Sequence, residues 1–230
     1  MDKFTTPPTA SKKFFTRQIL FVFLFGLILG VALFSSYGYY RLSRQNSTVD
    51  KEISYQTSPA VFDITGSDHI WGNKDATTTL VVFADLTCPY CREYYDNLKQ
   101  LMVTRSEKLR IVWRHLPLSL NSVLSVSSAV ATECAGEQGN FFEYCEELYA
   151  NQDKFSPEFY QAVAVNLGLN SDDFATCVSS GRYENKIKAD YNEGVAKGVD
   201  GAPASFLNGR YLPGTLPLSQ LEILVDPLIK

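Results

Sequence analysis

The sequence predicts an α/β domain with an inserted all-helical subdomain, preceded by one N-terminal transmembrane helix. An uncharged apolar run over residues 18–40 predicts the membrane helix. A strand–helix–strand pattern over 78–118 predicts the α/β part, and helical periodicity over about 121–199 predicts the insertion. Because 45% of the 230 residues are hydrophobic, we expect one well-packed domain over residues 59–230, not a disordered chain or a disulfide scaffold.

The predicted membrane anchor comprises residues 18–40. About 20 apolar residues cross a bilayer core as a helix, and this run holds 23 residues without a charge. Residues 1–17 carry four basic residues and one acidic residue, so we expect a cytoplasmic tail. A cleaved signal peptide is the alternative, but the run is long for one and residues 34–38 offer a poor cleavage site. We therefore expect a single-pass protein of the cell membrane with an extracytoplasmic domain.

Residues 41–58 are polar and lack an apolar period, which predicts a flexible tether between the anchor and the domain. Residues 45–230 hold 15 Lys and Arg against 24 Asp and Glu, a net charge of −9. Nucleic acid is excluded as a partner on this ground, because phosphate binding needs positive charge.

The next segment predicts a β-α-β unit. Residues 78–85 form a short run of apolar, branched and aromatic residues, typical of a buried central strand. Apolar residues at three- and four-residue spacing after Cys88 predict a helix, and residues 109–118 predict a second strand ending at Pro117. Cys88 and Cys91 therefore lie where the first strand passes into the helix.

Helical periods continue through the predicted insertion, with breaks at Gly139-Asn140, Ser156-Pro157, Asn170-Ser171 and Gly181-Arg182. Strand signals return at residues 204–207, and the hairpin turn signal Asn208-Gly209 leads into a further strand. A closing helix is predicted over about 218–229.

The motif Cys88-Pro89-Tyr90-Cys91 carries the chemistry that the sequence predicts. A cysteine at a helix N-terminus lies near free backbone N–H groups and the positive end of the helix dipole, which stabilise its thiolate. Pro89 suits the first helical position, because its missing N–H has no partner there. Cys91 lies on the same face of the first turn, so the two thiols can cycle between dithiol and disulfide.

Two other interpretations of a CxxC motif are half of a zinc site and a structural clip. Zinc would need further ligands among the remaining cysteines, His69 and His115, and none stands at paired ligand spacing. We therefore expect no metal and no cofactor, and we interpret His69, Trp71 and His115 as packing or hydrogen-bonded residues.

Several blocks resemble landmarks of the DsbA-like thiol-disulfide oxidoreductases of the thioredoxin fold, in the order of that family. They are His69-Ile-Trp-Gly-Asn-Lys-Asp-Ala, Val81-Val-Phe-Ala-Asp-Leu-Thr-Cys-Pro-Tyr-Cys, Arg114-His-Leu-Pro-Leu, Glu133-Cys-Ala-Gly-Glu-Gln-Gly-Asn-Phe-Phe-Glu-Tyr, Phe174-Ala-Thr-Cys and Gly201-Ala-Pro-Ala-Ser-Phe-Leu-Asn-Gly-Arg. The resemblance covers about residues 60–230 and implies a thioredoxin fold.

The resemblance implies a cis peptide bond between Ala202 and Pro203, in a loop that faces Cys88 and offers backbone hydrogen bonds to an extended substrate. A plain turn proline is the alternative. Tyr90 departs from the Cys-Pro-His-Cys of the family's best-known strong oxidants. We expect thiolate stabilisation to depend mainly on helix N–H groups, and the disulfide to be less oxidising than theirs.

Cys134 and Cys177 resemble positions that form a structural disulfide in some relatives, which leaves Cys145 as a small buried side chain. A link between Cys134 and Cys145 is the alternative, because sequence cannot determine connectivity. Asp85 is either a partly buried carboxylate that tunes the thiols or a solvated acid at the strand end.

These residues predict an enzyme that oxidises the cysteines of reduced exported proteins. The resemblance implies reoxidation by a quinone-linked membrane partner, DsbB-like or similar to vitamin K epoxide reductase. One alternative is a membrane-anchored reductase or isomerase, since Cys-Pro-Tyr-Cys also occurs in such proteins. Another is a non-enzymatic tethered binding or chaperone module.

Overall fold

The computed structural model describes Phe34, Tyr37 and residues 59–229. The chain divides into two compact units, Met1–Thr57 and Ser58–Lys230, and the second contains every strand of the described residues. The predicted tail, nearly all of the anchor and the tether lie outside the described residues, and within the anchor only Phe34 and Tyr37 are described. No helix within the described part of the chain is both long and apolar enough to span a bilayer.

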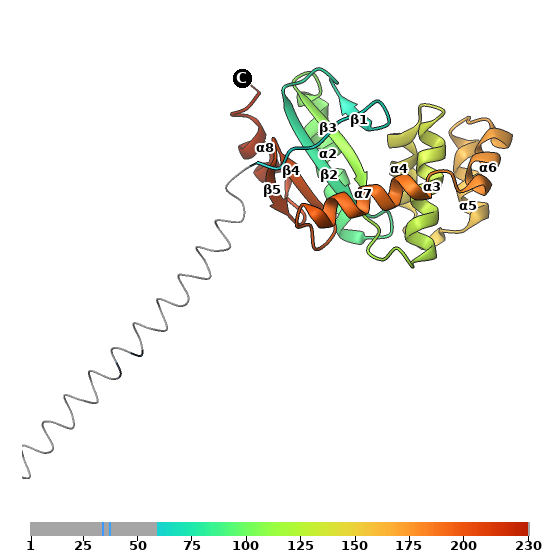
Figure 1. The fold of residues 1–230 in the computed structure, drawn as a ribbon. Helices are drawn as coiled ribbons and strands as arrows, with labels where there is room; N and C mark the ends of the chain where they lie inside the picture. The colour runs from blue at the N-terminus through green and yellow to red at the C-terminus, as the bar shows by residue number, and fades with distance from the viewer. Residues whose placement is uncertain (1–33, 35–36, 38–58, 230) are drawn as a thin grey trace, which may run out of the picture. The chain divides into compact units, whose positions relative to one another are not determined.

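The second unit has the α/β architecture that the sequence predicts, built on a mixed five-stranded sheet (Figure 1). The strands lie in the order β1-β3-β2-β4-β5. Only the β2–β3 pair is parallel, and the other three neighbouring pairs are antiparallel. The strands are β1 (His69–Gly72), β2 (Thr78–Ala84), β3 (Leu109–His115), β4 (Ala204–Leu207) and β5 (Arg210–Pro213).

Two clusters of buried side chains cover the two faces of the sheet. On one face, Leu80 and Val82 of β2 share a core with the helices α2 (Pro89–Arg105) and α8 (Leu218–Val225). On the other face, Val81 and Phe83 pack with Phe206 of β4 and a further set of apolar side chains. Because successive side chains of β2 point to opposite faces and both faces are buried, the strand is continuously apolar from residue 80 to residue 84.

The helical insertion comprises α3 (Val123–Gly136), α4 (Phe141–Ala150), the 3-10 helix η1 (Gln152–Lys154), α5 (Pro157–Asn166), α6 (Ser171–Ser180) and α7 (Glu184–Ala196). Ser156 and Asn170 accept hydrogen bonds from backbone N–H groups at the starts of α5 and α6, and Gly181 ends α6 in a left-handed conformation. These are capping roles, and they explain why the sequence breaks fall at helix boundaries. In Figure 1, α7 runs from the insertion back to the sheet, where it contacts β3.

The element bounds differ from the sequence prediction in three places. β1 was not predicted, because four residues are too few to show a period and the strand exists by pairing with β3. β3 ends at His115, two residues before Pro117, which has no N–H for the ladder. The last helix ends at Val225 with Asp226 as its C-cap, because Pro227 has no N–H to continue the helical hydrogen bonds.

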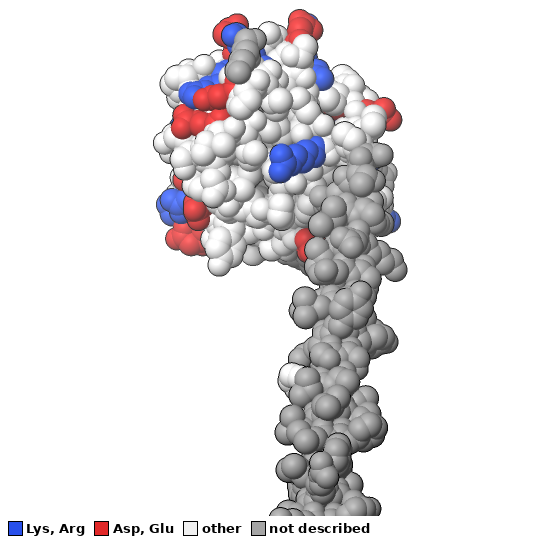
Figure 2. All heavy atoms as spheres, turned by 90° about the vertical axis from the view of Figure 1, so that its left-hand side faces the viewer, with Lys and Arg blue, Asp and Glu red and all other residues white. Residues whose placement is uncertain are grey.

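One face of the described domain carries few charges. Figure 2 shows this face as mostly uncharged, with one basic side chain near its middle and most other charged side chains towards its edges. The acidic residues that give the chain its net negative charge are therefore not concentrated on this face.

Candidate functional site

The CxxC motif lies where the sequence places it, at the start of α2. Cys88 is the N-cap residue with extended backbone, and Pro89 occupies the first helical turn. Cys88 and Cys91 are free thiols with exposed fractions of 3% and 1%, while Tyr90 between them is 65% exposed. A helix start that forms directly after a buried strand therefore brings both sulfurs to the end of the sheet.

The pKa values of the two thiols are shifted in opposite directions. A hydrogen bond from the Cys91 thiol is the main cause that lowers the pKa of Cys88, to about 6; burial opposes it and the backbone N–H groups of Cys91 and Tyr90 assist. Burial raises the pKa of Cys91 well above its ordinary value. The Cys91 thiol is the largest single cause, ahead of either backbone N–H group alone, so the helix start and the second thiol both stabilise the Cys88 thiolate.

The loop before β4 faces the first cysteine. The Ala202–Pro203 peptide bond is cis, and the carbonyl oxygen of Ala202 lies 3.5 Å from Cys88 Sγ. The loop is held there because β4, which follows it, pairs with β2, which leads into the motif. Two segments that are 114 residues apart in the chain thus form one site.

Asp85, at the end of β2, is buried with an exposed fraction of 2%, so the interpretation as a solvated acid is wrong. Its carboxylate accepts hydrogen bonds from the Thr87 backbone N–H at 2.8 Å, the Thr87 hydroxyl at 2.8 Å and the Leu118 backbone N–H at 2.7 Å. Its own N–H donates to Cys91 Sγ at 3.4 Å. Asp85 thus connects the end of β2 by hydrogen bonds to the motif and to the loop after β3.

Tyr149 and Gln152 of the insertion also contact the segment between β2 and α2, and sequence reasoning missed both. The Tyr149 hydroxyl donates to the Asp85 carbonyl oxygen at 3.4 Å. The Gln152 amide nitrogen donates to the carbonyl oxygens of Leu86 at 2.8 Å and Cys88 at 3.0 Å. No local pattern identifies these contacts, because the partners come from distant segments.

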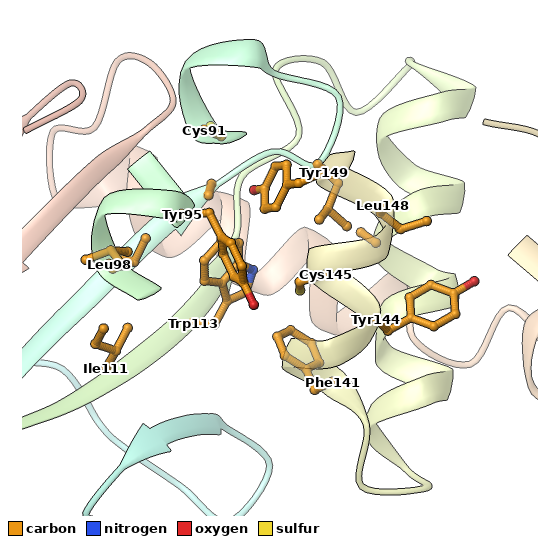
Figure 3. Packing of buried hydrophobic residues seen from close by; sticks show 14 of the residues in the cluster. Cys91, Tyr95, Leu98, Ile111, Trp113, Phe141, Tyr144, Cys145, Leu148 and Tyr149 are labelled. Carbon is orange, nitrogen blue, oxygen red and sulfur yellow. The ribbon is translucent and has the colours of Figure 1, made fainter. Parts of the chain in front are cut away.

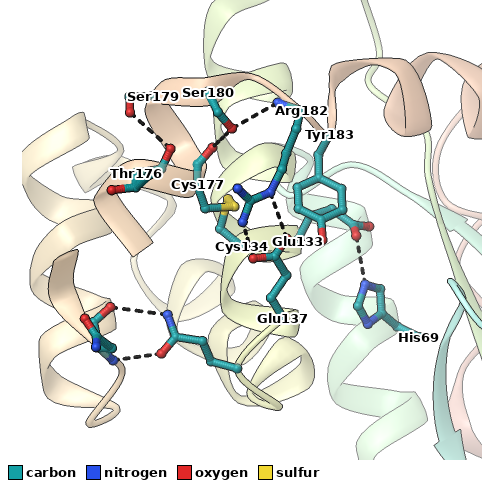
Figure 4. Close-up of a disulfide and its surroundings, with 12 residues drawn as sticks. His69, Glu133, Cys134, Glu137, Thr176, Cys177, Ser179, Ser180, Arg182 and Tyr183 are labelled. Carbon is teal, nitrogen blue, oxygen red and sulfur yellow. Dashed lines mark hydrogen bonds and ion pairs between the residues drawn. A yellow bond between two sulfur atoms is a disulfide. The ribbon is translucent and has the colours of Figure 1, made fainter. Parts of the chain in front are cut away.

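The remaining cysteines lie inside the helical insertion. A disulfide joins Cys134 of α3 to Cys177 of α6 (Figure 4). Cys145 is a free thiol, so no Cys134–Cys145 link is formed, and burial raises its pKa well above the ordinary value. Figure 3 shows Cys145 among aromatic side chains that include Trp113 and Phe141.

A buried ionic cluster lies beside this disulfide, around Glu133. Its carboxylate oxygens lie 2.9 Å from His69 Nε2, 3.0 Å from His115 Nε2 and 2.8 Å from Lys186 Nζ. Burial alone would raise the pKa of Glu133, but these partners outweigh it and lower the pKa below the ordinary range. The two histidines are hydrogen-bonded residues, and sequence reasoning missed the carboxylate that they share.

Five apolar side chains are exposed in the motif and in the segment from the end of β3 to the start of α3: Tyr90, Leu118, Leu120, Val123 and Leu124. A hollow of about 230 Å³ is lined by Leu118 and by Gly201, the residue before Ala202 of the cis peptide bond, among others. Within residues 59–229, no group of three or more His, Cys, Asp and Glu side chains is arranged to hold a metal ion. The site thus combines a reactive thiol with an apolar surface.

Three comparisons relate the chain to known proteins. A family model described as Thioredoxin matches residues 65–227. The fold is similar to the thiol-disulfide exchange protein alpha-DsbA2 of Wolbachia pipientis, with a TM-score of 0.65 and 23% identity over 81% of this chain and 98% of that one. It is also similar to oxidised BdbD of Bacillus subtilis, with a TM-score of 0.64 and 14% identity over 74% of this chain and 95% of that one.

A curated relative is described as Na(+)/H(+) antiporter NhaA 3 of Salinispora tropica. It is 34% identical over 158 residues, which are 69% of this chain and 24% of that protein. The chain thus spans about a quarter of the length of the curated relatives that it matches. A match of this extent says nothing about ion transport by this chain.

Proposed function

Since the chain belongs to the thioredoxin family and has the DsbA-like fold of thiol-disulfide oxidoreductases, we propose that it oxidises cysteines of exported proteins through a Cys88–Cys91 disulfide. The asymmetry of the two thiols is the observation that carries the proposal. Cys88 is favoured as a thiolate and Cys91 as a thiol. A stabilised reduced form makes the corresponding disulfide a better oxidant.

The exchange takes two steps. In the oxidised protein, a substrate thiolate attacks Cys88 Sγ, a bond forms between these sulfurs and the Cys88–Cys91 bond breaks. The electron pair leaves on Cys91, which takes up a proton because its pKa is high. A second substrate thiolate then attacks the substrate sulfur of the mixed disulfide, which completes the substrate disulfide and releases Cys88 as a thiolate.

Geometry supports Cys88 as the exchanging sulfur. Cys88 lies opposite the Ala202 carbonyl, and an extended substrate backbone that bonds to this loop would bring its cysteine to the same sulfur. Backbone bonds are independent of side-chain identity, and the exposed apolar side chains nearby suit unfolded segments. These features support a broad range of reduced proteins as substrates.

Each cycle leaves two electrons on the protein, so a second partner must accept them. We propose a quinone-linked membrane oxidase, DsbB-like or similar to vitamin K epoxide reductase, and attachment of the chain to the cell membrane by residues 18–40 with the N-terminus in the cytoplasm. The uncharged run of 23 residues and the basic residues before it support this placement.

The test is a redox titration of the purified full chain in graded glutathione buffers, followed by disulfide transfer to a reduced, unfolded protein. We expect an oxidising potential and transfer that is lost in Cys88→Ser. A strongly reducing potential would favour the reductase or isomerase alternative. A motif inert to exchange would leave only the non-enzymatic binding module.

A further inference from the structure

The amide of Gln152, in the helical insertion, makes two hydrogen bonds to the turn that carries Cys88. Gln152, the first residue of η1, donates its Nε2 hydrogens to the carbonyl oxygens of Leu86 and Cys88, at 2.8 and 3.0 Å. An amide nitrogen has two hydrogens, and here each carbonyl takes one. Gln152 thus spans the turn between β2 and α2 from one side.

The two carbonyl oxygens differ in how much they depend on this amide. The Cys88 carbonyl also accepts the Arg92 backbone N–H, as the first hydrogen bond of α2, at 3.2 Å. Among the hydrogen bonds of residues 59–229, the Leu86 carbonyl accepts only the Gln152 amide. Leu86 is buried, so losing the amide would leave its carbonyl oxygen without a partner and away from water.

This turn carries the sulfur that exchanges. The N–H groups of Tyr90 and Cys91 can stabilise Cys88 Sγ only while the first turn of α2 keeps its orientation. The partial negative charges of the Leu86 and Cys88 carbonyl oxygens lie in the same turn, where the positive end of the Gln152 amide offsets them. The amide therefore acts on both the geometry and the electrostatics around the thiolate.

We propose that Gln152 is a positioning residue for thiol-disulfide exchange, by which the helical insertion holds the Leu86–Cys88 turn in its reactive geometry. The inference rests on the proposed function, because it concerns the same sulfur. The helical insertion would then influence the reactivity of Cys88 directly, in addition to any role in binding substrates.

The chain offers a matched control for this contact. Gln161 of α5 is half-buried like Gln152, and its amide nitrogen also makes two hydrogen bonds, to the backbone oxygen and the hydroxyl of Ser171. That contact lies wholly within the insertion. Gln161→Leu therefore removes the same chemistry without touching the motif.

The experiment measures the alkylation of Cys88 by iodoacetamide against pH in the reduced full chain, with peptide mass spectrometry to distinguish Cys88 from the other thiols. In Gln152→Leu we expect the alkylation rate at pH 6 to fall about twofold or more, the change that a rise of half a unit in a pKa of about 6 gives at this pH. Gln152→Glu keeps the size but places a carboxylate against two carbonyl oxygens, so we expect a larger fall. Gln161→Leu should follow the wild-type profile.

Thermal unfolding of each variant shows that it is folded, and Gln152→Glu serves if Gln152→Leu fails to fold. Profiles for both Gln152 variants that coincide with the wild-type profile would overturn the proposal and leave Gln152 a structural residue. Disulfide transfer by the wild-type chain is a separate readout. Its absence would sink the proposed function, while the alkylation profiles would still decide the role of Gln152.

Discussion

At the scale of single residues, the site depends on the contrast between two cysteines three positions apart. Both are buried, yet the pKa of Cys88 is lowered to about 6 and that of Cys91 is raised. The hydrogen bond between the two thiols explains part of the contrast, because the Cys91 thiol donates to the Cys88 thiolate. Cys91 therefore stabilises the Cys88 thiolate of the reduced protein.

Substitution of Cys91 tests this contrast. In Cys91→Ala we expect the pKa of Cys88 to rise by about one unit or more, because the largest stabilising contact is lost. Cys91→Ser keeps a donor and should show a smaller rise. The pH dependence of Cys88 alkylation measures both, and a Cys91→Ala midpoint that stays near 6 would show that the helix N–H groups suffice.

At the scale of elements, two features hold the helical insertion in place: the packing of α7 against the sheet and the disulfide between α3 and α6. α7 returns to the sheet at Gly194, where a Cβ atom would lie 3.0 Å from both Phe83 and Leu116. The helix backbone there lies closer to these two side chains than a residue with a Cβ atom usually allows. The helix can therefore lie close to the end of the sheet that carries the motif.

Gly194→Ala should reduce the free energy of unfolding by roughly 1–3 kcal/mol, the usual cost of overpacking a core. Gly66→Ala is the control, since nothing lies within 4 Å of a Cβ atom at that position. Urea denaturation of both variants measures the effect. Equal stability of the two would mean that α7 can move away from the sheet at no cost.

The Cys134–Cys177 disulfide closes a loop of the insertion, with its cysteines 43 residues apart. Because it restricts the unfolded chain, we expect the double variant Cys134→Ala, Cys177→Ala to lose roughly 2–4 kcal/mol of stability. Chemical denaturation without reductant, in a background of Cys88→Ser and Cys91→Ser, measures this loss. With the motif intact, the alkylation profile of Cys88 should remain unchanged, and a shifted profile would show that the disulfide acts on the site.

At the scale of the whole domain, Glu133 links the insertion to the sheet. It lies on α3, and its partners come from β1 (His69), β3 (His115) and α7 (Lys186). Arg114 continues the ionic contacts on β3, pairing with Asp68 before β1 and with Glu193 of α7. Ion pairs and hydrogen bonds between charged groups, as well as apolar contacts, therefore join the helical insertion to the sheet.

Glu133→Gln should lower the free energy of unfolding by roughly 1.5–3 kcal/mol at pH 7, because Lys186 keeps only Asp190 as an ion-pair partner and the two histidines lose the charged acceptor that they share. The folded-state pKa of Glu133 lies below its unfolded value, so its contribution is present above that value of 4.5 and is lost as the pH falls below it. Urea denaturation at pH 7 and pH 4 should show the difference between wild type and variant shrinking. An equal difference at both values would contradict the assignment.

The sequence by itself determines the elements around the motif and the position of the two cysteines. Apolar runs predict β2 and the periodicity after it predicts α2, while Pro89 marks the first turn, so Cys88 must lie at a helix start. The caps Ser156 and Asn170 likewise set helix starts from neighbouring residues. These features depend on contacts within a few residues, and a local pattern records them.

Tertiary structure alone decides which distant residues meet. The Ala202 carbonyl comes to Cys88 from 114 residues away, and the Gln152 amide comes from 64 residues away. The pairing of Cys134 with Cys177, the shared partners of Glu133 and the edge strand β1 are of the same kind. Each depends on how the sheet and the helices pack, because a side chain's own neighbours in sequence carry no information about a partner in another element.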